Sequence, residues 1–121
     1  MPEYTEAEKA QIAHNEAKDA ERAARAEKYR DLLNKLKVAV GFTPAEPGVY
    51  DHTAFDIDYM AMAMTKTSCL IKRPMQMMEG GGIPGFYSYY DWKKRIEIVV
   101  APNKAKRKAY LLLFPEAEAI D

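Results

Sequence analysis

The sequence is poor in the residues that build disulfides, metal sites and membrane spans. Its 121 residues include a single cysteine, Cys69, so no disulfide can form within the chain. The two histidines, His14 and His52, show no repeated spacing from cysteines or carboxylates of the kind that holds a metal ion. No apolar run approaches the roughly 18 residues of a membrane-spanning helix. We therefore expect no metal, no cofactor and no membrane span.

Net charge is absent as well, because 18 lysines and arginines are balanced by 18 acids. A chain without net charge has no general attraction for nucleic acid, so any such binding must come from a local patch. Residues 1–5 are polar and lack the apolar core of a signal peptide. Together with the single cysteine, this favours a reducing compartment and predicts a cytoplasmic protein.

The composition is that of an ordinary globular chain. Hydrophobic residues make up 48% and charged residues 30%, and a length of 121 residues fits one domain. We predict an α+β fold, in which one long N-terminal α-helix is followed by a small, mainly antiparallel β-sheet of three to five strands. The expected segments of this single domain, residues 1–121, are a helix over 6–40, a connection over 41–54, a β-rich core over 55–114 and an acidic tail over 115–121.

The predicted helix over 6–40 has a start signal and a stop signal. Thr5 and Glu8 have the spacing of a capping box, and Gly41 followed by Pro44 ends the helical pattern. At 1.5 Å per residue the helix would be roughly 52 Å long, whereas a domain of this size is about 30 Å across. Either the helix breaks in two, or part of it projects and meets another chain.

Small residues follow the first half of this helix at alternating spacings of three and four. They form an alanine seam, which consists of Ala10, Ala13, Ala17, Ala20 and Ala24. Such a seam allows close contact between helices and predicts a homo-oligomer, although a solitary, solvated helix also fits the pattern. Larger apolar residues continue in a shifted register from Tyr29 and suit a domain core.

Four further segments carry strand patterns. Residues 55–64 fit both a strand and a helix, and we favour the strand. Residues 68–73 form a clearer strand that ends at a proline. Residues 94–100 and 108–114 are predicted to form a hairpin, joined by a basic turn over 101–107.

Charge is separated along the chain, although it balances overall. Residues 66–109 hold ten lysines and arginines against three acids, a local excess of +7. Within this stretch a triple glycine over 80–82 precedes five aromatic residues over 86–92. Aromatic rings stack on bases, cations bind phosphates, and glycines let backbone N–H groups approach an anion. The candidate ligand-binding residues are Phe86, Tyr87, Tyr89, Tyr90, Trp92, Lys72, Arg73, Lys93, Lys94, Arg95, Lys104, Arg107 and Lys108.

Packing offers a second interpretation of the same stretch. A strand over 86–92 would alternate between core and solvent, so that half of its rings would be packing residues and the glycines would only make turns. Basic residues in the turn over 101–107 would keep a strand edge from aggregating. Cys69, in an apolar segment, fits a buried small side chain better than a nucleophile.

These patterns favour a non-enzymatic binding protein for a phosphate-bearing ligand, either a nucleotide or single-stranded nucleic acid. The alternative is a protein–protein interaction module, an assembly component or inhibitor, that uses the long helix and a methionine- and tyrosine-rich surface. A small hydrolase is a third hypothesis, and it depends on convergence of Asp51, His52, Asp56 and Asp58 in one cleft. We expect no catalytic residues and no enzyme.

Overall fold

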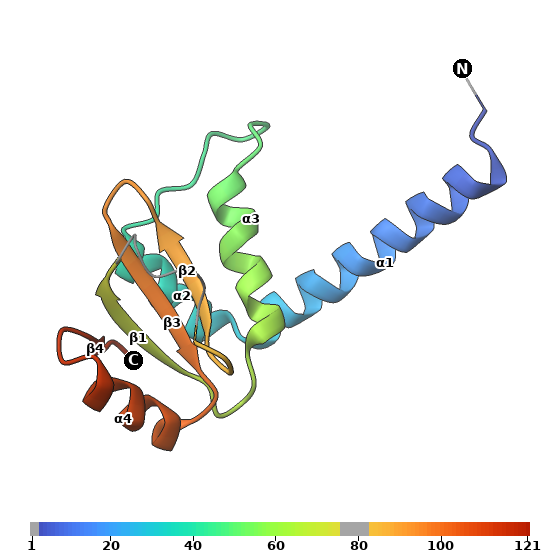
Figure 1. Ribbon diagram of the computed structural model, residues 1–121. Helices are drawn as coiled ribbons and strands as arrows, with labels where there is room; N and C mark the ends of the chain where they lie inside the picture. Colours follow the sequence, from blue (N-terminus) through green and yellow to red (C-terminus); the bar gives the residue numbers. More distant parts are fainter. Residues whose placement is uncertain (1–2, 76–82) are drawn as a thin grey trace.

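The protein is a four-stranded sheet with helices on both faces and one helix that projects away from this body (Figure 1). The computed structural model describes residues 3–75 and 83–121. The strands are antiparallel and lie in the order β2-β3-β1-β4. The predicted α+β class, with a long N-terminal helix and a small antiparallel sheet, is confirmed.

The first three α-helices lie in the first half of the chain, and the four strands lie in the second half together with a fourth helix. The elements are α1 (Glu6–Lys28), α2 (Arg30–Val40), α3 (His52–Tyr59), the 3-10 helix η1 (Met60–Ala63), β1 (Cys69–Pro74), β2 (Tyr87–Asp91), β3 (Ile96–Ala101), α4 (Lys104–Leu113) and β4 (Glu118–Ala119).

The helix predicted over 6–40 is divided into α1 and α2 at Tyr29, whose φ of −107° and ψ of 26° leave the helical region. The capping box is present: the Thr5 hydroxyl accepts from the Glu8 N–H at 3.1 Å, and the Glu8 carboxylate accepts from the Thr5 N–H at 3.3 Å. Gly41 ends α2 in the left-handed conformation, with a φ of 65°. The break redirects the apolar residues of α2 onto the sheet, whereas α1 continues outward (Figure 1).

The strand expected over 55–64 is wrong, because this segment is α3 followed by η1. Asp51 caps α3, and its carboxylate accepts from the Ala54 N–H at 3.0 Å. Helical spacing then places Ile57, Ala61 and Met64 together in the core. In a strand, Ile57 would share a face with Phe55, but Ile57 is buried and Phe55 is only half-buried.

The hairpin expected over 94–114 is also wrong, because its second strand is helix α4. Asn103, assigned to the turn, is the N-cap of α4, and its side chain accepts from the Lys106 N–H at 2.8 Å. Leucine, alanine and lysine favour helix, and the spacing from Tyr110 to Phe114 packs both rings on the sheet. The partner of β3 in the hairpin is β2, connected through a turn over 92–95.

Two apolar layers enclose the two central strands. Leu70 of β1 and Ile98 of β3 pack against α2 and α3, and Ile71 and Val99 pack against Tyr110 of α4. The predicted strand over 68–73 is confirmed as β1, which Pro74 ends. Because β1 and β3 are covered on both faces, their sequences are almost continuously apolar rather than alternating.

Candidate functional site

Helix α1 presents a large free surface. None of its 23 residues, all of which the structure describes, is buried. At 1.5 Å per residue it extends about 35 Å, and most of that length stands clear of the body (Figure 1). The alanine seam is exposed throughout.

The base of α1 is fixed to the body by two arginines. The Arg25 guanidinium donates to the Ala61 carbonyl at 3.2 Å and to the Met64 carbonyl at 2.7 Å, and so satisfies backbone acceptors at the end of η1. The Arg22 guanidinium lies 4.3 Å from the centroid of the Phe55 ring. These contacts set the direction in which the helix leaves the body.

The alanine seam points away from the body. Successive residues of a helix turn by about 100°, so Arg22, Arg25 and Tyr29 share one side. Ala17 and Ala20 fall on the other side. The seam is therefore open along its whole length, and its small side chains leave room for close approach of a second helix.

A second exposed apolar surface lies on α4, on the side turned away from the sheet. We define the α4 outer face as Ala105, Ala109, Leu112 and Leu113. Leu112 and Leu113 are 76% and 72% exposed. Three exposed lysines border this face, and they are Lys104, Lys106 and Lys108.

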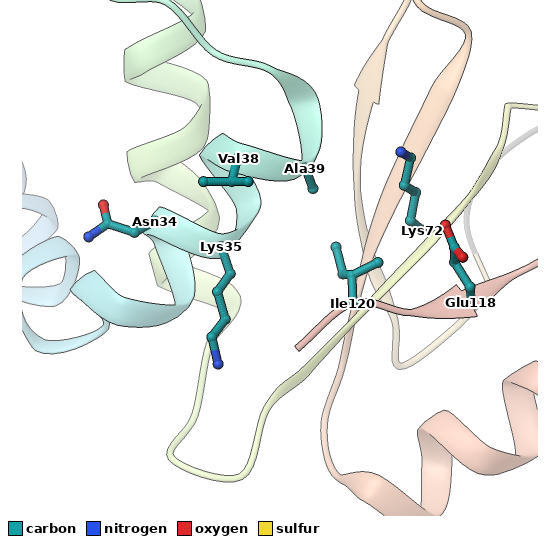
Figure 2. Close-up of a pocket in the computed structure, with 7 residues that line it drawn as sticks. All are labelled: Asn34, Lys35, Val38, Ala39, Lys72, Glu118 and Ile120. Carbon is teal, nitrogen blue, oxygen red and sulfur yellow. The ribbon is translucent and has the colours of Figure 1, made fainter.

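An open groove of about 380 Å³ separates α2 from the edge of the sheet. It is lined by Asn34, Lys35, Val38, Ala39, Lys72, Glu118 and Ile120. Lys35 and Lys72 extend toward opposite ends of the groove, and Glu118 is the cross-strand neighbour of Lys72 (Figure 2). The groove therefore combines an apolar floor with charges that do not converge on one small anion.

One predicted ligand cation, Arg73, is used inside the protein. Its guanidinium is ion-paired with Glu97 at 3.0 Å, and the two side chains are only 5% and 7% exposed. It also donates to the Tyr110 hydroxyl at 3.0 Å and lies 4.4 Å from the Phe114 ring centroid. Burial raises the pKa of Tyr110, and the Arg73 charge opposes this rise.

The other predicted cations are spread over the molecule. Lys94 donates to the Val40 carbonyl at the end of α2, and Lys93 and Arg95 share the turn over 92–95. Lys72 lies on the opposite face of β1 from Arg73. The turn stands at one end of β3, and α4 begins at the other end.

The cations of α4 are themselves divided between two environments. Arg107 is ion-paired with Asp121, whereas Lys104 and Lys108 are exposed. The structure thus places the three basic clusters at three different positions on the body.

The aromatic residues over 86–92 are divided between core and surface. Phe86 packs on Tyr110 with ring centroids 5.2 Å apart, and Tyr89 packs in the core against α2 and α3. Burial raises the pKa of Tyr89, with a further contribution from nearby Asp91. Tyr87, at the start of β2, and Trp92, just after its end, are exposed.

Tyr90 is half-buried and lies beside Trp92, with ring centroids 6.1 Å apart. The triple glycine over 80–82, to which a role in anion binding was assigned, lies outside the described residues.

The acidic residues proposed for a hydrolase are engaged in local structure. The Asp51 carboxylate accepts from the N–H groups of Ala54 and Ala45, and these bonds lower its pKa. His52 and Asp56 form an exposed pair at 3.0 Å, one turn apart on α3. Cys69 is buried in β1.

Over residues 3–75 and 83–121, no group of three histidine, cysteine or acidic side chains is arranged to hold a metal ion. No helix in these ranges is both long and apolar enough to cross a membrane. Comparisons with protein families, with curated proteins and with solved structures found no match.

The α4 outer face was not predicted from the sequence, because residues 108–114 also fit the pattern of a strand. The signal was present: Asn103 is a strong N-cap residue, and the apolar residues that follow recur at helical intervals of four, three and one. That spacing places them on one face of a helix and away from Tyr110.

Proposed function

We propose that this protein is a protein–protein interaction module whose projecting helix α1 binds a helix of a second copy of the chain. The observation that supports this proposal is a helix of 23 residues with no buried residue and a base fixed by Arg25. A helix used only to complete the core would bury an apolar face, as α2 does.

Helix energetics give α1 a reason to bind. Most helical stability in proteins comes from packing of one face, and no residue of α1 is buried against the body. The alanine seam buries little area per residue, but it lets two backbones come close. Association would therefore stabilise α1 itself as well as join two chains.

A substitution in the middle of the seam tests the proposal. Ala17→Arg places a large charged side chain in the seam without breaking the helix, and we expect it to weaken association about tenfold or more. Asn15→Arg is the matched control, because it adds the same charge on the other side of α1. Sedimentation velocity over a concentration series measures the association of the wild-type chain and of both variants. A wild-type chain that stays monomeric throughout would overturn the proposal.

A second candidate is binding of a phosphate-bearing ligand at the turn between β2 and β3. It is favoured by one observation: the exposed Trp92 ring lies beside Tyr90 and is followed by exposed Lys93. Rings of this kind stack on bases, and a neighbouring ammonium binds phosphate. This site uses far fewer residues than the basic stretch as a whole.

Trp92 is the only tryptophan, so its fluorescence reports directly on this second candidate. Titration with a thymidine oligonucleotide and with free nucleotides at two salt concentrations should quench it more strongly at low salt. No change with either ligand at low salt would exclude the candidate.

We also propose a cytoplasmic location. The support is the single cysteine, which lies buried in β1 and has no partner within the sequence for a disulfide. Imaging of the full chain with a small tag in its source cells tests this, and accumulation outside the cytoplasm would refute it.

A further inference from the structure

We infer that the α4 outer face is the surface on which α1 of a second copy docks, an inference that rests on the proposed function of α1. The α4 outer face is apolar, exposed and framed by lysines. The alanine seam is small, exposed and set in an acidic helix. The two surfaces are therefore complementary in side-chain size and in charge.

Charge complementarity is the first argument. Residues 3–21, which precede the first arginine anchor of α1, contain six acids against two lysines, a formal charge of −4. Residues 104–113 contain four cations and no acid, and Arg107 is already paired with Asp121. Three lysines remain on the exposed side of α4 to meet the acids of α1.

The positions of the charges agree with this pairing. At about 100° per residue, Glu16 and Glu21 border the alanine seam on its two sides. Lys106 and Lys108 border the α4 outer face on its two sides in the same way. Lys9 also borders the seam, on the side of Glu16, where it is ion-paired with Glu6. The seam is thus flanked mainly by acids and the α4 outer face by cations, which favours this pairing.

Side-chain size gives a second argument. The alanine seam is a shallow channel between longer side chains, and Leu112 and Leu113 stand out from α4. Large side chains of one helix fill the spaces over small side chains of another in ordinary helix packing. Two alanine seams placed together would bury much less apolar area than this combination.

Repulsion disfavours the simplest alternative, in which two copies of α1 pair with each other. Each copy carries a charge of −4 over residues 3–21, so the pairing would bring like charges together. Contact with α4 of the same chain is disfavoured by geometry. Helix α1 contacts α2, α3 and η1 and leaves the body on the side away from α4 (Figure 1).

The first test is to change α4 alone. Leu112→Glu combined with Leu113→Glu should weaken association about tenfold or more, as Ala17→Arg does. Val38→Glu is the matched control, because Val38 is 82% exposed on α2 and outside both surfaces. Sedimentation velocity gives the dissociation constants, and circular dichroism checks that each variant keeps its helices.

The second test is to mix two defective chains. The Ala17→Arg chain keeps an intact α4, and the Leu112→Glu/Leu113→Glu chain keeps an intact α1. A mixture should form a one-to-one pair that neither chain forms alone. Charge reversal provides an independent check: Lys106→Glu/Lys108→Glu should weaken association, and adding Glu16→Lys/Glu21→Lys to the same chain should restore it.

The outcomes separate this inference from the proposed function. Loss of association in Ala17→Arg with none in the α4 variants would show that α1 pairs elsewhere, which overturns the role of α4 and leaves that of α1 standing. A wild-type chain that never associates overturns both. If the double leucine variant fails to fold, the charge-reversal pair decides, and absence of rescue refutes the inference.

Discussion

The side chain of Arg73 shows how burial changes what a residue can do. In the sequence it is one of ten cations in a basic stretch, yet in the fold it neutralises Glu97 between β1, β3 and α4. Removing two charges from water is costly, and their mutual attraction and hydrogen bonds offset that cost only while both partners are present. The pair therefore makes the local fold sensitive to the loss of either residue.

Glu97→Gln should lower the free energy of unfolding by about 3 to 5 kcal/mol, because it removes the carboxylate that is ion-paired with the buried Arg73 guanidinium. The matched control is Glu27→Gln, which removes an exposed partner of Arg30 at the same N–O distance of 3.0 Å. That change should cost less than about 1 kcal/mol. Urea denaturation measures the free energy of unfolding of both variants. Equal losses would contradict the claim that the buried pair contributes more than the exposed one.

The Asp51 carboxylate gives the fold a dependence on acid. Its two backbone N–H partners lower its pKa from the ordinary value of 3.8. Because the folded-state pKa is the lower one, Asp51 stabilises the fold above the unfolded-state pKa, and this contribution is lost as the pH falls through the folded-state pKa.

Asp51→Asn keeps a capping oxygen but removes the titration. Thermal midpoints measured from about pH 6 to about pH 2 should fall more steeply for the wild-type chain than for this variant. Parallel curves for the two chains would show that the carboxylate does not contribute.

At the scale of elements, the junction between α2 and the loop that follows depends on one glycine. Gly41 adopts a φ of 65°, and a Cβ built there would meet the Lys94 amine, which donates to the Val40 carbonyl. An alanine would therefore strain the backbone and displace a cap at the end of the helix.

Gly41→Ala should lower the free energy of unfolding by about 1 to 3 kcal/mol. Gly48→Ala is a useful comparison, since its φ is 85° but a Cβ there would meet nothing within 4 Å. Thermal unfolding measures the loss of stability in both variants. A larger loss for Gly41→Ala than for Gly48→Ala would give the contribution of the Lys94 contact. Equal losses would mean that backbone strain alone acts.

Helix and strand ends that are marked by capping residues, glycine or proline could be predicted from the sequence. The capping box starts α1 where Thr5 and Glu8 indicate, Gly41 ends α2, and Pro74 ends β1. Short apolar runs were mispredicted, because residues 55–64 and 108–114 fit two periodicities and only tertiary packing selects one.

The candidate site could be predicted less completely than the fold. The open alanine seam of α1 was visible as a spacing, and so were the aromatics of β2. Which cations reach solvent was not visible, because the pairing of Arg73 with Glu97 depends on strand register. The α4 outer face was hidden by the wrong assignment of its secondary structure.

At the scale of the whole molecule, the body and α1 are separable in energetic terms. Removal of residues 3–21 leaves Arg22 and Arg25 in place and takes away no buried side chain. The free energy of unfolding of the remaining chain should stay within about 1 kcal/mol of the full chain. Association, measured by light scattering, should disappear. A truncated chain that no longer unfolds cooperatively would show that α1 is part of the core.

The placement of α1 and α4 on opposite sides of the sheet gives any assembly built from them a direction (Figure 1). In the proposed docking, every chain donates α1 on one side and accepts on α4 on the other, so a row of chains ends in one unused donor and one unused acceptor. Growth would continue until the row closes into a ring or meets a chain that lacks one function. A small fraction of the Ala17→Arg chain would therefore act as a terminator and set the mean length of the row.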